Sequence, residues 1–204
     1  MSPLTLRRIH LGEPSAAEQL ARLRDELGAQ GNVVSERSRQ LTRKVFGAPL
    51  TPQQVVEHIC DNVRRRGLPA ALDYTEHFDR IRLTPETLRV TPAEMHLAHA
   101  AADPGFLDTV RRVRQNILSF QLGLLHGDAE LQVAGSHRLR LRYRPLRRVG
   151  VVVPGGAAAY PSTLLMTICP AQAAGVHELA VVMPPTPNGG YNRDLLAVCH
   201  ELGV

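Results

Sequence analysis

Apolar residues recur at helical spacing through the first 125 positions of this chain, and helix start signals separate the apolar stretches. Ser15, Thr51 and Thr91 each precede a Glu or Gln by three residues, which is the capping-box pattern. Asp103 precedes a Pro and a longer apolar stripe, and a shorter helix is predicted through residues 71–78. The pattern therefore predicts a region built from several short helices.

Residues 31–50 are polar, basic and poorly periodic, and they predict a basic linker with about one helical turn. The pattern changes near residue 130, where Leu131 and Val133 alternate with polar residues and the run RLRLRYR follows at 138–144. Alternation with period two predicts an antiparallel pair of strands. We therefore expect a helical region over 1–129 and a separate α/β domain over 130–204.

The last third alternates between buried strands and helices. Residues 149–153 and 179–183 are short apolar runs typical of strands that are buried on both faces. A helix is predicted over 162–174, kinked or split by Pro170, and another after Asn192. This order predicts two parallel strands with a right-handed crossover. Two strands are few for a stable sheet, so the expected fold is α/β, with an incomplete, truncated Rossmann-like βαβα unit.

Composition and charge exclude several classes of protein. The net charge is +5, but the arginines are dispersed and aromatic residues make up only 4%, which disfavours nucleic-acid binding. No signal peptide and no apolar run of about 18 residues is visible, so we expect no membrane association. Three widely spaced cysteines predict no disulfide framework and favour a cytoplasmic location.

The residues themselves indicate one candidate binding feature and no catalytic or metal site. Pro154, Gly155 and Gly156 follow a predicted strand, where such a turn either brings the backbone close to a ligand or merely joins strand to helix. His96 and His99 are three apart on a predicted helix, but no third metal ligand is visible, so a solvated helix face is expected.

The run RPLRRVGVVVPGGAAAYPSTLLMTICPAQAAGV at 144–176 resembles the signature stretch of histidinol dehydrogenases, and residues 55–79 and 184–204 are similar to the same family. The resemblance implies a homodimeric, zinc-dependent enzyme that oxidises L-histidinol to L-histidine through the aldehyde, using two NAD in succession. The family's zinc ligands and acid/base Glu-His pair lie in regions without a counterpart here. The resemblance implies that part of the NAD-side wall is present, formed by Val152, Pro154, Gly155, Gly156 and Pro184.

Val152 stands where family members commonly have a Tyr that touches the cofactor. Because a third strand is missing and the regions with the zinc ligands and the acid/base pair have no counterpart here, our first hypothesis is an N-terminal portion of a histidinol dehydrogenase that is inactive as this chain alone. The alternative is a non-catalytic remnant of that fold that binds a nucleotide or a partner, such as a complementary C-terminal half or a second copy. A basic helical protein that contacts nucleic acid is a third and weaker hypothesis.

Overall fold

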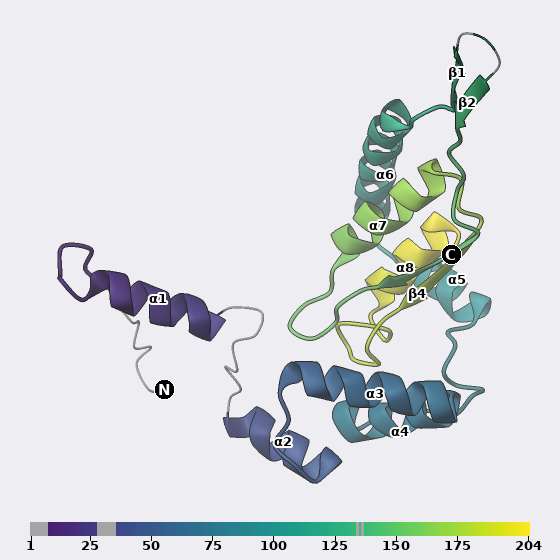
Figure 1. The fold of residues 1–204 in the computed structure, drawn as a ribbon. Coiled ribbons are helices and arrows are strands. Elements are labelled where there is room, and N and C mark those ends of the chain that lie inside the picture. Colours follow the sequence, from purple (N-terminus) through teal and green to yellow (C-terminus); the bar gives the residue numbers. More distant parts are fainter. Residues whose placement is uncertain (1–7, 28–35, 134, 136) are drawn as a thin grey trace. The chain divides into compact units, whose positions relative to one another are not determined.

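The computed structural model describes residues 8–27, 36–133, 135 and 137–204. It divides the chain into two compact units, Met1–His77 and Phe78–Val204. The described part of the first unit forms the helices α1 (Ala16–Leu27), α2 (Glu36–Phe46), α3 (Pro52–Arg66) and α4 (Leu68–Asp79), the last of which ends just beyond the unit boundary (Figure 1).

Two of the three predicted capping boxes are confirmed. Thr51 Oγ1 accepts from the Gln54 backbone N–H at 3.3 Å, and Gln54 Oε1 accepts from the Thr51 N–H at 3.0 Å. Thr91 and Glu94 make the same exchange at the start of α5 (Pro92–Ala100). At α1 the structure differs, because Ser15 Oγ accepts from the side-chain amide of Gln19.

The linker expected over 31–50 is wrong for residues 36–46, which form α2; residues 31–35 lie outside the described residues. The helix is mostly polar and basic, so it has few apolar residues that would mark it in the sequence. Its stabilising contacts are distant in sequence: the Phe46 ring lies 5.8 Å from the ring of His58 and 6.0 Å from that of Tyr74. The buried Thr42 hydroxyl also accepts from the Leu50 N–H at 3.2 Å.

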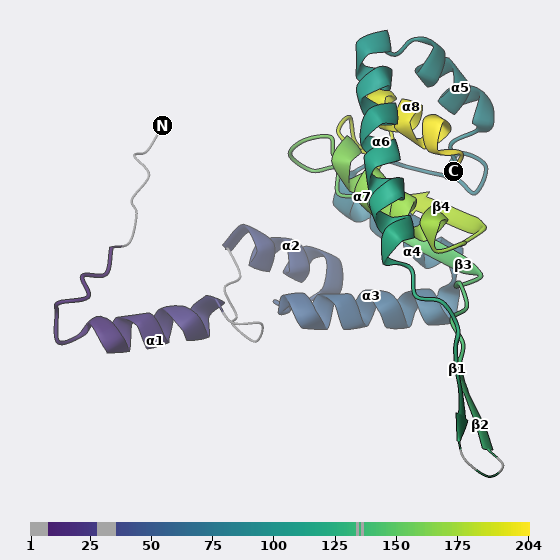
Figure 2. The ribbon, with the colours of Figure 1, turned by 90° about the horizontal axis from the view of Figure 1, so that it is seen from above.

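The second unit has the predicted α/β architecture (Figures 1 and 2). After α5 and α6 (Pro104–Leu124), β1 (Ala129–Val133) and β2 (His137–Leu141) form the expected antiparallel pair. β3 (Arg148–Val152) and β4 (Glu178–Val182) then pair in parallel, and α7 (Pro161–Ala173) and α8 (Arg193–Leu202) complete the predicted βαβα order.

The core of this unit lies where α7 and α8 pack together and α7 contacts β3. Its largest fully buried side chains include Leu164, Ile168, Leu195 and Leu202. α7 runs unbroken through Pro170, so the helix is not split. The buried side chains that precede the proline, among them Ile168 and Cys169, hold the helix in place, which offsets the backbone hydrogen bond that proline cannot make.

Helix α5 packs against α8, and α6 packs against α7. Because of these contacts, α5 and α6 belong to the same compact unit as the α/β part. The division into 1–129 and 130–204 stays a prediction about which segments fold independently. Among the described helices, none combines the length and apolarity that crossing a bilayer requires.

Candidate functional site

The predicted turn lies at the carboxyl end of the two parallel strands. β3 and β4 end in register, with Val152 opposite Val182, and the Val153 N–H donates to the Val182 carbonyl at 2.9 Å. The turn at 154–156 and the segment 184–191 follow these two strands. The five residues that the sequence places in an NAD-side wall, Val152, Pro154, Gly155, Gly156 and Pro184, therefore follow or end neighbouring strands at one edge of the sheet.

Gly155 is required by the neighbouring loop. A Cβ at this position would lie 2.6 Å from Cα of Gly189 and 2.9 Å from its nitrogen, so backbone already fills the space of a side chain. A Cβ at Gly189 would in turn collide with the Pro184 carbonyl oxygen. The two loops after β3 and β4 therefore interlock through a pair of glycines.

Polar side chains reinforce this interlock. Thr186 Oγ1 donates to the Gly155 carbonyl at 2.5 Å, and Asn188 Nδ2 donates to the Gly156 carbonyl at 3.3 Å. The sequence reasoning missed Thr186, Asn188 and Gly189 as parts of the site. Their run, Thr-Pro-Asn-Gly-Gly, is a turn signal, which places a loop there but does not reveal what the loop contacts.

Gly156, unlike Gly155, has open space where a side chain would lie. A Cβ on Gly156 would meet no heavy atom within 4 Å, so the protein itself does not require a glycine there. The Val152 side chain is 76% exposed beside this turn. The described turn thus offers backbone groups and apolar surface to a ligand, and because it carries no titratable side chain it can bind and orient but not transfer protons.

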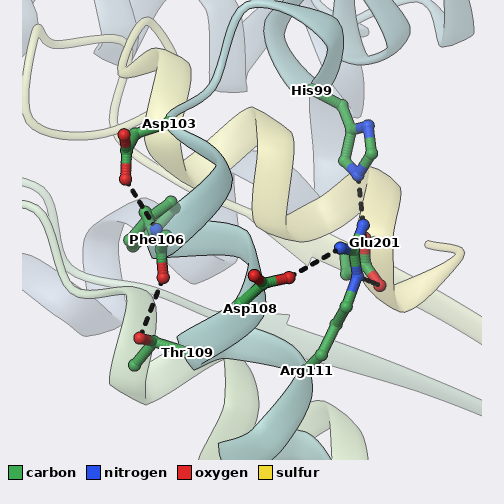
Figure 3. A network of polar contacts seen from close by, with 8 residues as sticks. His99, Asp103, Phe106, Asp108, Thr109, Arg111 and Glu201 are labelled. Atoms are coloured by element: carbon green, nitrogen blue, oxygen red, sulfur yellow. Dashed lines mark hydrogen bonds and ion pairs between the residues drawn. The ribbon is translucent and has the colours of Figure 1, made fainter.

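A separate polar cluster joins α5, α6 and α8 (Figure 3). Glu201 accepts from Nε of Arg111 at 3.0 Å, and its other oxygen lies 2.8 Å from Nε2 of His99. The hydrogen bond from Arg111 is the main reason that the pKa of the Glu201 carboxyl is lowered, and the one from His99 adds to it. The expectation of a solvated face is wrong for His99, whose side chain is only 21% exposed because it packs against α8.

The cluster does not form a metal site. Within the part of the chain that the structure describes, no group of three or more His, Cys, Asp or Glu side chains is placed to hold a metal ion. The rings of His96 and His99 do lie near that of His200, with centroids 5.4 and 4.5 Å apart. Cys199 is buried beside His200, and its burial raises the pKa of the thiol to about 11, so it stays protonated.

Comparisons with known proteins place residues 48–204 in the histidinol dehydrogenase family model. The histidinol dehydrogenase of Rhodopirellula baltica is 53% identical over 93% of this chain and 41% of its own length. That of Geobacillus kaustophilus is 37% identical over 80% of this chain and 38% of its own length.

A crystal structure of histidinol dehydrogenase from Elizabethkingia anophelis matches with a TM-score of 0.67 and 26% identity, over 74% of this chain and 35% of that one. The chain thus spans about two fifths or less of the length of these relatives. The matched residues include both parallel strands and both interlocked loops. By its sequence and its fold, this chain belongs to the histidinol dehydrogenase family.

Proposed function

We propose that this chain is part of an NAD- and zinc-dependent histidinol dehydrogenase, which oxidises L-histidinol through the aldehyde to L-histidine, and that it supplies part of the NAD-binding wall. The observation that carries the proposal is the position of the turn at 154–156, which lies inside the family match, at the carboxyl ends of parallel strands, with the Gly156 side open. Dinucleotides bind at this edge of α/β sheets.

The residues at and beside the turn are suited to form part of the wall of an NAD-binding site. Gly156 leaves room for close approach to its backbone, and Val152 offers apolar surface, without the hydroxyl and ring of the Tyr common in the family. Pro154 and Pro184 limit the backbone freedom of the two loop starts. NAD, when bound, supplies the hydride acceptor, and the role of these residues is to bind and orient it.

The described residues do not fit zinc, because no group of ligating side chains in them is suitably placed. The proposal is that turnover requires the part of the relatives that this chain does not span, so that the 204-residue chain alone has no dehydrogenase activity.

One observation favours the alternative role in binding a partner. Gly150 and Ala180 pair across β3 and β4, and on the same face Val152 and Val182 are 76% and 59% exposed. A second chain, either a complementary half or another copy, would cover this apolar face and the sheet edges. Sedimentation velocity of the pure chain tests this role: a monomer at all concentrations removes the second copy, and a monomer after addition of the complementary half removes that partner.

The NAD-binding proposal is tested by calorimetric titration of the 204-residue chain with NAD. The informative variant is Gly156→Val, because the fold has room for a side chain there while a ligand on that side would meet it. We expect NAD affinity to fall at least about tenfold, which corresponds to about 1.4 kcal/mol, with an unchanged unfolding midpoint. Gly127→Val, also in open space in this unit, is the matched control. Failure of the unsubstituted chain to bind NAD would contradict the proposal.

A further inference from the structure

The loop 184–191 holds the backbone carbonyl groups of both Gly155 and Gly156 by hydrogen bonds. Gly155 O accepts from Thr186 Oγ1, and Gly156 O accepts from Asn188 Nδ2. These two contacts connect the turn after β3 to a loop about 30 positions later in the chain.

The supporting loop is itself fixed by backbone hydrogen bonds. The Pro184 carbonyl accepts from the Thr186 N–H at 2.8 Å and from the Gly190 N–H at 2.9 Å. The Thr186 carbonyl accepts from the Gly189 N–H at 3.0 Å. Thr186 therefore presents its hydroxyl from a backbone that is already constrained, at a position that is partly buried.

Peptide geometry relates these carbonyls to the next N–H groups. The described residues contain no cis peptide bond, and in a planar trans peptide the N–H points opposite to the preceding C=O. Because the carbonyls of Gly155 and Gly156 point to the loop 184–191, the N–H groups of Gly156 and Ala157 point away from it. Two successive N–H groups directed to one side form a favourable site for an oxygen anion.

We infer that Thr186 and Asn188 are positioning residues of the NAD-binding turn, which orient the N–H groups of Gly156 and Ala157 toward an anionic oxygen of the ligand, such as a phosphate oxygen of the dinucleotide. This inference rests on the proposed function. Thr186 carries more of the effect, because its contact is shorter and less exposed than that of Asn188. Neither residue touches a reacting atom; both act through the backbone.

The test compares Thr186→Val, which removes the hydroxyl at nearly constant volume, with Thr186→Ser, which retains it. The matched control is Thr167→Val, because Thr167 Oγ1 donates to a backbone carbonyl of α7 at 2.6 Å in the same unit. Asn188→Ala is an exposed second variant that tests the other carbonyl if Thr186→Val fails to fold. For each chain we would measure NAD affinity by calorimetry, thermal unfolding, and the mobility of the 155–157 amides by ¹⁵N relaxation.

We expect Thr186→Val to weaken NAD binding by about two- to tenfold, the range for one hydrogen bond, and Thr186→Ser to restore it. Thr167→Val should bind as the unsubstituted chain does. NAD affinity unchanged in Thr186→Val would overturn the inference and leave the proposed function standing. Equal losses in Thr186→Val and Thr167→Val would also overturn it, because a general loss of stability would then explain both.

If the unsubstituted chain does not bind NAD, the proposed function fails separately, and the amide mobilities decide the positioning role. Greater mobility at 155–157 in Thr186→Val than in Thr167→Val supports that role. Equal mobility in the two variants overturns it.

Discussion

Replacing Gly155 by Ala tests the interlock between the two loops directly. The new Cβ would lie 2.6 Å from the Gly189 Cα, whereas carbon atoms in favourable contact are about 3.5 Å or more apart, so the backbones must separate by roughly 0.9 Å. Forcing an extra group into a packed site costs about 1–3 kcal/mol. The same movement strains the hydrogen bonds from Thr186 and Asn188, each worth about 0.5–1.5 kcal/mol. We therefore expect a loss of about 2–6 kcal/mol, toward the lower end if the loop 184–191 moves away as a unit.

Urea unfolding followed by circular dichroism measures this loss. With a slope of about 1–3 kcal/mol per molar urea, a loss of 2 kcal/mol moves the midpoint by roughly 1 M. Gly156→Ala is the matched control, because the same substitution one residue later enters open space. A free energy of unfolding of Gly155→Ala within about 0.5 kcal/mol of that of the unsubstituted chain, the ordinary range of a surface substitution, would contradict the close packing of Gly155 against Gly189. Equal destabilisation of Gly156→Ala would contradict it as well.

The remaining predictions concern the polar cluster and the thiols. The Arg111 hydrogen bond holds the Glu201 pKa below its ordinary value of 4.5, so the stabilisation is present above pH 4.5 and is lost as the pH falls through the folded-state pKa. Glu201→Gln should therefore lower the free energy of unfolding at pH 7 by about 1.5–3 kcal/mol. If the difference in stability between the variant and the unsubstituted chain does not shrink below pH 4.5, the ionised Glu201 carboxylate is not its source. With a thiol reagent at pH 8, the exposed Cys60 should react at once, whereas Cys169 and Cys199, whose pKa values are raised by burial, should react only on unfolding; a second rapid thiol in the folded chain would contradict their burial.

The parts of the fold that the sequence predicts are those with local signals. The capping boxes at Thr51 and Thr91 involve residues three apart, and the Asn192 cap also acts within its own first turn. The strand and helix alternation after residue 148 is likewise visible in short windows. The sequence does not predict α2, because Phe46 of this helix contacts the rings of His58 and Tyr74, which belong to later helices.

The candidate site likewise has parts that the sequence indicates and parts that only the structure shows. The turn at 154–156 is visible in the sequence, but the hydroxyl that holds the Gly155 carbonyl comes from Thr186, 31 positions later. His99 reads as a surface residue because its partner, Glu201, is 102 positions away. A pattern of residue types contains no distance between such groups, so only the folded chain reveals that they pair.

The two glycines of the turn are indistinguishable in the sequence, yet the structure gives a reason for only one of them. Gly155 must lack a side chain because the Gly189 backbone occupies that space, and this holds whether or not a ligand binds. Gly156 meets no such neighbour within the described chain, so the fold would accept a larger residue there. Close approach of NAD, as proposed above, would account for a glycine at this turn that the fold does not need. Loss of stability in Gly155→Ala combined with loss of NAD binding alone in Gly156→Val would therefore separate the structural glycine from the ligand-binding one.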